Sequence, residues 1–358
     1  MSAWSDCKNV LVIRADNMGD LLLSSPAIQV LQQHLNCKIT LLTSGKAQAI
    51  VPMLPGIDDL LICNVPWVKL DGNNDPEEFL RLLLLIKSKS FDACVIFTVY
   101  SQNPMPAILL TYLAEIPLRL AYCRENPYHL LTDWVPDQEP YQIIKHQVQR
   151  DLDLVAATGV VAEAPALKIN IPETGYQRAW QQLIPLGLDI LREPYFILHP
   201  GVSEAKRRYP KQHWIALAQK LQQTFHLPVL FTGSAAEVAL AREIAAQAGK
   251  ACFAVAGLLG LDEFAVLIDQ AKAVISVNTG TVHLAAALQT PVVVLHAQTN
   301  PQHSPWKVPH KVLEFSVPEA LKSKNEVIRW VDQILYTKYC PYPDANQVLA
   351  ALKEICPD

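Results

Sequence analysis

The chain has 358 residues, a length that predicts two domains. Hydrophobic residues make up 51% of it and charged residues 18%, a composition that can bury a large core and excludes a disordered chain. With 30 basic and 34 acidic residues the net charge is −4, which excludes the whole-surface basic field of a non-specific nucleic-acid binder. We therefore expect a two-domain globular protein that has no nucleic-acid partner.

The eight cysteines are scattered, with no CxxC spacing and no Cys/His cluster at metal-ligand spacing. We expect reduced, mostly buried thiols and no metal site. The N-terminus has no basic segment leading into an apolar one, and Pro104 and Pro106 interrupt the long uncharged stretch 93–114. The sequence thus predicts a cytoplasmic protein without a transmembrane segment.

Apolar runs alternate with helical patterns along the first half of the chain. A helix that includes residues 26–31 follows the first run, and a second helix is predicted around 79–86. Runs that are apolar on both faces and separated by helices predict a parallel sheet covered on both sides. The predicted strands are residues 10–13, 38–42, 60–62 and 93–97.

The alternation loosens between residues 164 and 194, where four prolines occur, and then resumes. The predicted strands of the second half are 195–198, 228–231, 252–255, 273–276 and 291–295, with helices at 214–224, 237–248 and 327–335. We predict an α/β fold of two doubly wound domains. The boundaries are an N-terminal domain 1–170, a linker 171–194, a C-terminal domain 195–325, and a C-terminal helix and tail 326–358.

The first strand-to-helix turn reads Arg14-Ala-Asp16-Asn-Met-Gly19-Asp20. It is not GxGxxG, and no GxxxxGK[ST] occurs, which disfavours a nicotinamide dehydrogenase and a P-loop NTPase. Asp20 stands at the start of the following helix. It is either a helix N-cap or a general base, and the spacing alone does not decide between them.

A second turn, Asn278-Thr279-Gly280-Thr281, leads from a strand into an alanine-rich helix. Unsatisfied N–H groups, two hydroxyls and a glycine that allows close approach suit a diphosphate, although an ordinary Asn/Thr cap would use the same residues. His283, one turn further on, is either a core histidine or a donor to the same phosphate.

Two more loops follow strands of the second half. The cations Lys206, Arg207 and Arg208 are either solvated charge or the counter-charge that a diphosphate needs. Glu237 follows Thr232-Gly233-Ser234 and either accepts hydrogen bonds from a ribose diol or favours a helix N-terminus.

Taken together, these loops resemble the heptosyltransferase family of glycosyltransferases (glycosyltransferase family 9). Its members have two Rossmann-like domains whose parallel sheets face a cleft, the arrangement called GT-B. The segments that carry the resemblance, in order, are Arg14-x-Asp16-x-x-Gly19-Asp20, His146-x-Val148-x-x-x-Leu152, His199-Pro-Gly, Tyr209-Pro210, Thr232-Gly233-Ser234, Asn278-Thr279-Gly280-x-x-His283 and Thr290-Pro291-Val292-Val293.

The resemblance implies transfer of a heptose, with inversion and without a metal or other cofactor, from an ADP-linked donor to lipopolysaccharide. The partners would be this nucleotide sugar and a lipid-linked or polysaccharide acceptor at the inner face of the membrane. Asp20 would be the general base. The implied donor-binding residues are Ser203 and Lys206 or Arg207 at the phosphates, Glu237 at the ribose, Leu259 near the base, Asn278 by the sugar, and Thr279, Gly280, Thr281 and His283 at the diphosphate.

The chain departs from the family pattern at Asn278, where members usually have Asp, and its phosphate loop is one residue longer. The Asn278 departure keeps open a GT-B transferase that uses another nucleotide sugar. A sugar-nucleotide-binding protein without transferase activity is a further alternative, against which the presence of Asp20 argues. Candidate contacts for an acidic acceptor are Arg14, Arg119, Arg124 and Lys145, and for the last three a solvated surface role is the favoured alternative.

Overall fold

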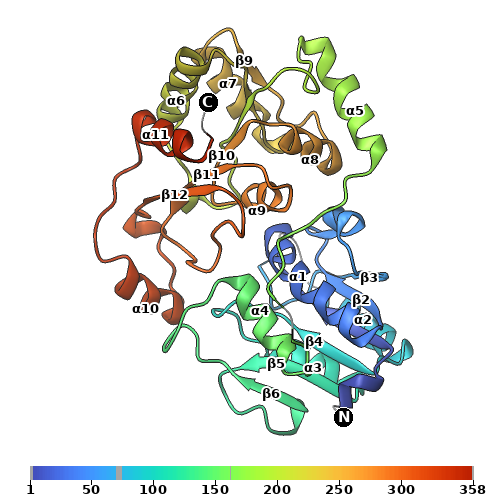
Figure 1. Ribbon diagram of the computed structural model, residues 1–358. Helices are drawn as coiled ribbons and strands as arrows, with labels where there is room; N and C mark the ends of the chain where they lie inside the picture. Colours follow the sequence, from blue (N-terminus) through green and yellow to red (C-terminus); the bar gives the residue numbers. More distant parts are fainter. Residues whose placement is uncertain (1–2, 70–74, 162, 357–358) are drawn as a thin grey trace. The chain divides into compact units, whose positions relative to one another are not determined.

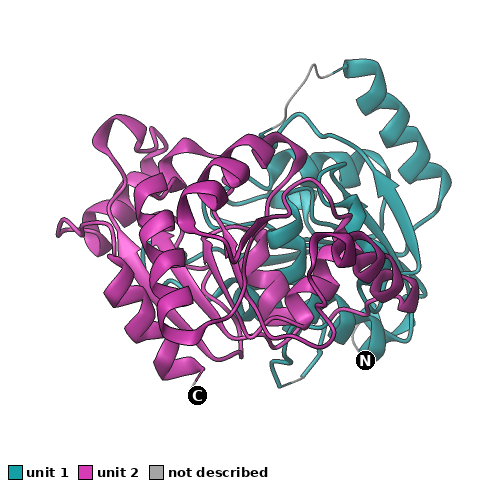
Figure 2. Cartoon of the chain, turned by 90° about the horizontal axis from the view of Figure 1, so that it is seen from above, with its two compact units in different colours: residues 1–168 teal, residues 169–358 magenta. Residues whose placement is uncertain are grey.

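The computed structural model describes residues 3–69, 75–161 and 163–356. The chain divides into two compact units, residues 1–168 and residues 169–358 (Figure 2). The change of unit falls close to the predicted end of the first domain. Each unit contains one six-stranded sheet.

The sheet of the first unit has the strand order β3-β2-β1-β4-β5-β6, and every neighbouring pair is parallel (Figure 1). Its strands are β1 (Asn9–Ile13), β2 (Lys38–Thr43), β3 (Asp59–Ile62), β4 (Ala93–Ile96), β5 (Leu118–Cys123) and β6 (Asp133–Pro136). Its helices are α1 (Met18–Leu35), α2 (Pro76–Ser88), α3 (Met105–Leu113) and α4 (Gln147–Ala156).

Both faces of this sheet are covered, as the two-sided apolar runs predict. Leu11 and Ile13 of β1 point to the face on which α2 and α3 pack. Helices α1 and α4 pack against each other, and α4 contacts β5. Because side chains alternate along a strand, this three-layer packing leaves the strand ends and their loops as the places for polar groups.

The second unit repeats the same topology, with strand order β12-β11-β10-β7-β8-β9 and parallel pairing throughout. Its strands are β7 (Phe196–His199), β8 (Val229–Phe231), β9 (Cys252–Ala254), β10 (Ala273–Val277), β11 (Val292–Ala297) and β12 (His310–Phe315). Its helices are α5 (Glu173–Leu183), α6 (Lys211–Phe225), α7 (Val238–Ala248), α8 (Leu261–Asp269), α9 (Gly280–Ala287), α10 (Glu326–Leu335) and α11 (Ala345–Ile355).

Helices α6, α7 and α11 share one hydrophobic core with this second sheet. Helix α11 contacts α6, β11 and β12, and its Val348 and Leu352 are fully buried. Helices α5, α8 and α9 form a second packed group, in which α8 contacts both of the others and α9 lies against β10 and β11.

The prediction of an α/β fold with two Rossmann-like domains is confirmed, since each sheet has the doubly wound order 3-2-1-4-5-6. The strands that the sequence did not predict are β5, β6 and β12. The segment 171–194, expected as a linker, contains α5, whose Arg178 bonds Asp262 and Glu263 of α8. The tail 326–358 likewise contains α11, which belongs to the core of the second unit.

The eight cysteines are free thiols, and five of them are buried. Among the residues that the structure describes, no helix is both long enough and apolar enough to cross a bilayer.

Candidate functional sites of the two units

The strand order of each sheet reverses at one point, between β1 and β4 in the first unit and between β7 and β10 in the second. Ligands of open parallel sheets bind beyond the carboxyl ends of the strands at such a reversal. The turn 14–20 follows β1, the loop 200–210 follows β7, and the turn 278–281 follows β10. Three of the loops singled out from the sequence therefore lie at the two expected positions, whereas the turn 232–234 follows the neighbouring strand β8.

Asp20 lies in the first turn of α1. The helix is capped by Asn17, and Asp20 completes a reciprocal capping box, with the backbone N–H of Asn17 donating to Asp20 Oδ2 at 3.3 Å. The other oxygen, Oδ1, lies 3.3 Å from Nη2 of Arg14. The side chain is 15% exposed, and its carboxylate is oriented by Arg14 and by the backbone of Asn17.

Arg14 is fully buried and lies between two carboxylates. Its Nε is 3.3 Å from Asp16 Oδ2, while its Nη2 contacts Asp20. The side-chain amide of Gln102 donates to Asp16, and burial raises the pKa of Asp16 although Arg14 opposes the rise. The loop backbone is held by Thr43, which donates to the carbonyl of Arg14 at 2.7 Å.

A third carboxylate, Asp151 of α4, is buried on the other side of this cluster. It accepts from Gln147 at 2.8 Å and from Ser24 of α1 at 2.6 Å, and Ser24 Oγ also lies 3.2 Å from the carbonyl of Asp20. Burial raises the pKa of Asp151 to about 6. This contact could not be predicted from the sequence, because Asp151 is 127 positions from Ser24 along the chain.

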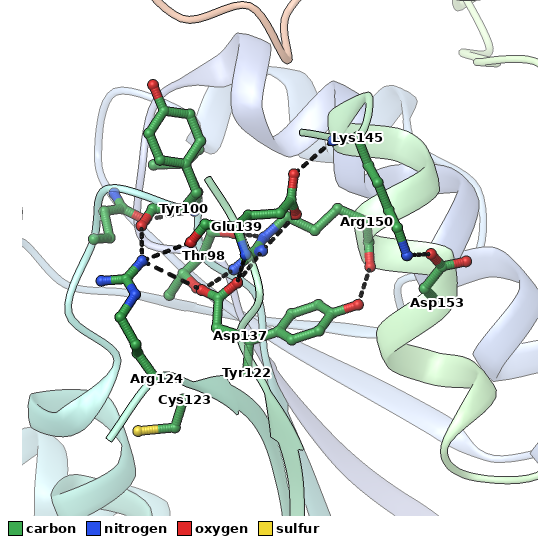
Figure 3. A network of polar contacts seen from close by, with 12 residues as sticks. Thr98, Tyr100, Tyr122, Cys123, Arg124, Asp137, Glu139, Lys145, Arg150 and Asp153 are labelled. Carbon is green, nitrogen blue, oxygen red and sulfur yellow. Dashed lines mark hydrogen bonds and ion pairs between the residues drawn. The ribbon is translucent and has the colours of Figure 1, made fainter. Parts of the chain in front are cut away.

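One residue before Asp151, Arg150 holds a second buried network (Figure 3). Its guanidinium binds both oxygens of Asp137 at 2.8 and 2.9 Å and Glu139 Oε2 at 2.6 Å. It also lies 4.2 Å from the centre of the Tyr122 ring. Helix α4 is thus fixed to the loop after β6 by a cation with two carboxylate partners.

The four cations considered for an acidic acceptor are engaged with protein groups. Arg14 and Arg119 are buried, and Arg119 donates to the backbone carbonyls of residues 116, 129 and 130. Arg124 donates to the carbonyls of Tyr100 and Glu139, and Lys145 pairs with Asp153 (Figure 3). Arg124 and Lys145 are each about one-third exposed, so of the four these two retain a surface that a ligand can contact.

In the second unit, the turn 278–280 leads into α9 without a side-chain cap. Thr279 occupies the N-cap position in an extended conformation and makes no capping hydrogen bond to the helix. Its hydroxyl lies 3.3 Å from Ser276 Oγ instead. The structure therefore does not support an ordinary Asn/Thr cap. The N–H of Val282 donates to the carbonyl of Thr279 at 3.1 Å, and Gly280 and Thr281 precede it at the positive dipole end of the helix.

The side chain of Asn278 turns toward the end of β11. Its amide oxygen accepts from the backbone N–H of Ala297 at 3.2 Å, and its amide nitrogen donates to Thr299 Oγ1 at 2.9 Å. An amide supplies an acceptor and a donor together, whereas an ionised carboxylate only accepts. Asn278 therefore ties the ends of β10 and β11 together, and its donation to the Ala297 carbonyl at 3.4 Å is the contact that an ionised aspartate could not make.

Of the two candidate phosphate cations, Arg207 is the more tightly engaged. Its Nη1 donates to the carbonyl of Asn278 at 3.1 Å and its Nη2 lies 3.2 Å from Glu204. Lys206 Nζ lies 3.4 Å from the same carboxylate, in a looser contact. Burial and the charge of Arg207 lower the pKa of His296, at the end of β11, to about 4.

Glu237 is folded back over the loops after β7 and β8. Its carboxylate accepts from the backbone N–H of Ser234 at 2.6 Å and from the Ser234 hydroxyl at 2.9 Å. A Cβ added at Gly201 would overlap this carboxylate, so a larger residue there would displace Glu237 from Ser234. The same carboxylate acts electrostatically on His199, whose pKa is lowered by burial.

The remaining donor candidates occupy the same edge of the second sheet or the loops beside it. Thr281 and His283 are buried in α9, and the ring of His283 lies 6.0 Å from that of His303. Ser203 is exposed, and Leu259 is half-buried between β9 and α8. Within residues 3–69, 75–161 and 163–356, no group of three or more His, Cys, Asp or Glu is placed to hold a metal ion.

Comparison with known proteins places this chain among sugar transferases. The model of the family described as "Glycosyltransferase family 9 (heptosyltransferase)" matches residues 80–327. Lipooligosaccharide heptosyltransferase 2 of Haemophilus influenzae is 25% identical over 312 residues, which cover 83% of this chain and 85% of that protein.

Solved structures of similar proteins share the fold over nearly the full chain. A glycosyl transferase family 9 protein of Veillonella parvula superposes with a TM-score of 0.79 at 18% identity, covering 98% of this chain and 97% of that one. A heptosyltransferase of Escherichia coli solved with ADP-2-deoxy-2-fluoro heptose gives a TM-score of 0.67 at 18% identity, covering 96% and 99%.

Proposed function

The chain belongs to glycosyltransferase family 9 (heptosyltransferase) and is therefore a glycosyltransferase, and from this premise we propose that it transfers a heptose from an ADP-linked donor to a lipopolysaccharide acceptor with inversion. The family supports the class of reaction. The proposal of donor, acceptor and stereochemistry draws on the two sets of loops at the sheet reversals. No cofactor is included in the proposal.

The observation that carries the donor assignment is the uncapped N-terminus of α9. Gly280 allows a phosphate to approach the backbone N–H groups, and the hydroxyl of Thr279 is not used for capping. Thr281, His283 and the exposed Ser203 lie within or next to the same loops. The E. coli structure that contains an ADP-heptose analogue gives this donor its independent support.

The proposed reaction is a single displacement at the anomeric carbon. Asp20 removes the proton from the acceptor hydroxyl while that oxygen forms its bond to the sugar. The bond from the anomeric carbon to the diphosphate breaks, and ADP leaves with the bonding electrons. One displacement from the side opposite the leaving group inverts the anomeric configuration.

Charge grows on the diphosphate as this bond breaks. Preorganised N–H donors of α9 and a nearby cation stabilise that charge more in the transition state than in the ground state. We assign the cation to Lys206, because Arg207 is already bound to Asn278 and Glu204. Glu237, oriented by Ser234, is assigned to the ribose hydroxyls, and Leu259 to the face of the base.

The first test is a thermal-shift screen of the protein against ADP, UDP, GDP and CDP. A ligand present at about 100 times its dissociation constant stabilises the folded state by about 2.7 kcal/mol, a shift of several degrees. Selective stabilisation by ADP is the expected result. A preference for UDP or GDP would discard the ADP-linked donor, and no shift with any nucleotide would contradict the assignment of the α9 site.

The second test follows the anomeric configuration of the product by NMR with an ADP-heptose donor and a lipopolysaccharide acceptor lacking the relevant sugar. Inversion relative to the donor is expected. Retention would contradict a single displacement assisted by Asp20.

A GT-B transferase that uses another nucleotide sugar is the second candidate, and Asn278 favours it. The amide is committed to Ala297 and Thr299, so the turn beside the diphosphate site carries no carboxylate at this position. The same NMR assay with a panel of nucleotide sugars distinguishes the two candidates. We further propose that the acceptor is met at the inner face of the membrane, which sedimentation with lipopolysaccharide-containing vesicles would test.

A further inference from the structure

Two carboxylates share one buried arginine at the end of β1, and this arrangement has a consequence for the proposed base. We propose that Asp16 is a positioning residue that keeps Asp20 basic, by dividing the charge of Arg14 between two carboxylates. The inference rests on the proposed role of Asp20. It concerns how that role is made possible, since Asp16 itself is not assigned a contact with substrate.

The geometry shows the division directly. Different nitrogens of one guanidinium contact the two residues, Nε of Arg14 at 3.3 Å from Asp16 and Nη2 at 3.3 Å from Asp20. Asp16 is held in place by the amide of Gln102, and Asp20 by the backbone of Asn17. Neither carboxylate therefore forms a bidentate ion pair with the guanidinium of Arg14.

Burial strengthens the electrostatic interactions of Arg14 with its two carboxylates. Arg14 is fully buried and Asp16 is 7% exposed, so their interactions are only weakly screened by water. A small cavity of about 20 Å³ adjoins Asp16 and Gln102 and is otherwise lined mainly by apolar side chains, among them Ile13, Val68 and Phe97. The remaining charged groups that act on Arg14 are Asp151 and Arg150, both from α4.

The chemical effect follows from charge. A carboxylate paired with an arginine of its own has its pKa lowered by one to three units and becomes a poor proton acceptor. The ionised Asp16 offsets this effect in two ways, because it attracts the same guanidinium and repels the negative charge of Asp20. Asp20, which is more exposed than Asp16, therefore keeps enough proton affinity to act on an acceptor hydroxyl.

The test is the pH profile of kcat/KM for the acceptor at saturating donor, in the full-length enzyme. In Asp16→Asn the neutral amide keeps the shape of the side chain, and of the two carboxylates in ion-pair contact with Arg14 only Asp20 remains. We expect the plateau rate to fall several-fold, because the base is weaker. The acid limb of the profile, where activity falls at low pH, should move down by about one pH unit. The thermal shift given by ADP should stay as in the unmodified protein.

A second variant shifts the profile in the opposite direction. Gln102→Met removes a hydrogen bond that favours ionised Asp16, so Asp16 becomes protonated at a higher pH. Activity should then begin to fall at a higher pH, and the acid limb moves up. This variant also keeps the proposal testable if Asp16→Asn does not fold.

Asp151→Asn is the matched control. It removes a neighbouring buried carboxylate that bonds Ser24 and Gln147, with no ion-pair contact to Arg14 within 4 Å in the described structure. It should move the acid limb less than Asp16→Asn does. An equal shift in both variants would mean that the general field of the cluster, and not the sharing of Arg14, sets the proton affinity of Asp20, and would overturn the proposal.

The remaining outcomes separate this inference from the proposed function. In Asp16→Asn the acid limb could stay at the same pH, while the melting temperature falls and the rate drops equally at every pH. This result would overturn the inference and leave Asp20 as the base. Full activity in Asp20→Asn would remove the base itself, and the inference with it.

Discussion

The two sheets have the same topology, yet the loops at their reversals differ in how they hold charge. The first unit buries ionised groups there, with Arg14 between two carboxylates and Asp151 close by. The second unit buries neutral groups, with His199 and His296 kept deprotonated by burial. One sheet thus carries buried charges at its reversal, where they act on the proposed base, and the other carries the helix N-terminus that we assign to the donor diphosphate.

The largest expected effect concerns the first unit, which contains the proposed base. Asp20→Asn removes the proposed base and should lower kcat by about 10² to 10⁴ while leaving the ADP-induced thermal shift nearly unchanged. Transfer assays and melting curves on the same preparation measure both. Because Asp20 lies in the first unit, a parallel loss of ADP affinity would contradict the separate roles given to the two units.

The next effect contrasts two arginines that each bind two carboxylates. Arg150→Met removes the buried cation that binds both Asp137 and Glu139 and leaves Arg124 only 3.9 Å from Asp137, which should cost about 3–5 kcal/mol of unfolding free energy. Arg178 of the second unit also has two carboxylate partners, but it is 46% exposed, so Arg178→Met should cost much less. Urea unfolding of the two variants checks the ranking, and equal losses would contradict it.

A smaller effect is expected at Gly201 in the second unit. A methyl group there overlaps the carboxylate of Glu237, the end of a flexible side chain, so Gly201→Ala should displace it from Ser234, cost about 1 kcal/mol and weaken ADP binding. Gly45 of the first unit is the matched control, since its added Cβ would lie 3.7 Å from Asn64 Oδ1, an ordinary contact. Calorimetric titration with ADP and thermal melts distinguish a specific effect from a general cost of alanine.

The smallest effect is a difference in pH response. His296, with a pKa of about 4 when folded, gives stability that is lost as the pH falls through the usual histidine value toward 4. Asp151, with its pKa raised to about 6, acts in the opposite sense, because the folded state binds the proton more tightly and gains stability as the pH falls through 6.

Between pH 6.5 and 5.5 the loss through His296 should be about 1 kcal/mol, with a somewhat smaller gain through Asp151. Unfolding of His296→Gln and Asp151→Asn at the two pH values measures each contribution against the unmodified protein. His296→Gln should become relatively more stable on acidification and Asp151→Asn relatively less stable. A change of relative stability in the same direction for both variants would contradict the opposite pH responses expected of His296 and Asp151.

Much of the fold followed from the sequence because parallel strands buried on both faces leave continuous apolar runs, such as residues 10–13 and 291–295. The edge strands β6 and β12 escaped prediction because each is only partly buried and carries polar residues, and β5 because it includes Arg119. Helix α5 was hidden by the prolines at either end of the segment, although Pro172 is its N-cap.

The candidate sites were found from the sequence because strand-to-helix turns are local and their position in a doubly wound sheet is known. The partners of their side chains could not be found in this way. Asp16 meets Gln102 across 86 positions, and Arg207 meets the carbonyl of Asn278 across 71. Whether a carboxylate has a cation to itself or shares one depends on such contacts, and these exist only after the chain has folded.

Helix α11 gives the chain an order of assembly during synthesis. The first unit has its last strand by residue 136 and its last helix by residue 156, so it can close its core early as the chain leaves the ribosome. The second unit cannot, because Val348 and Leu352 fill a core that also contains Trp214 and Leu221 of α6. Until those final residues emerge, the apolar face of α6 is open to chaperones and proteases, and a premature stop that removes α11 would make that exposure permanent.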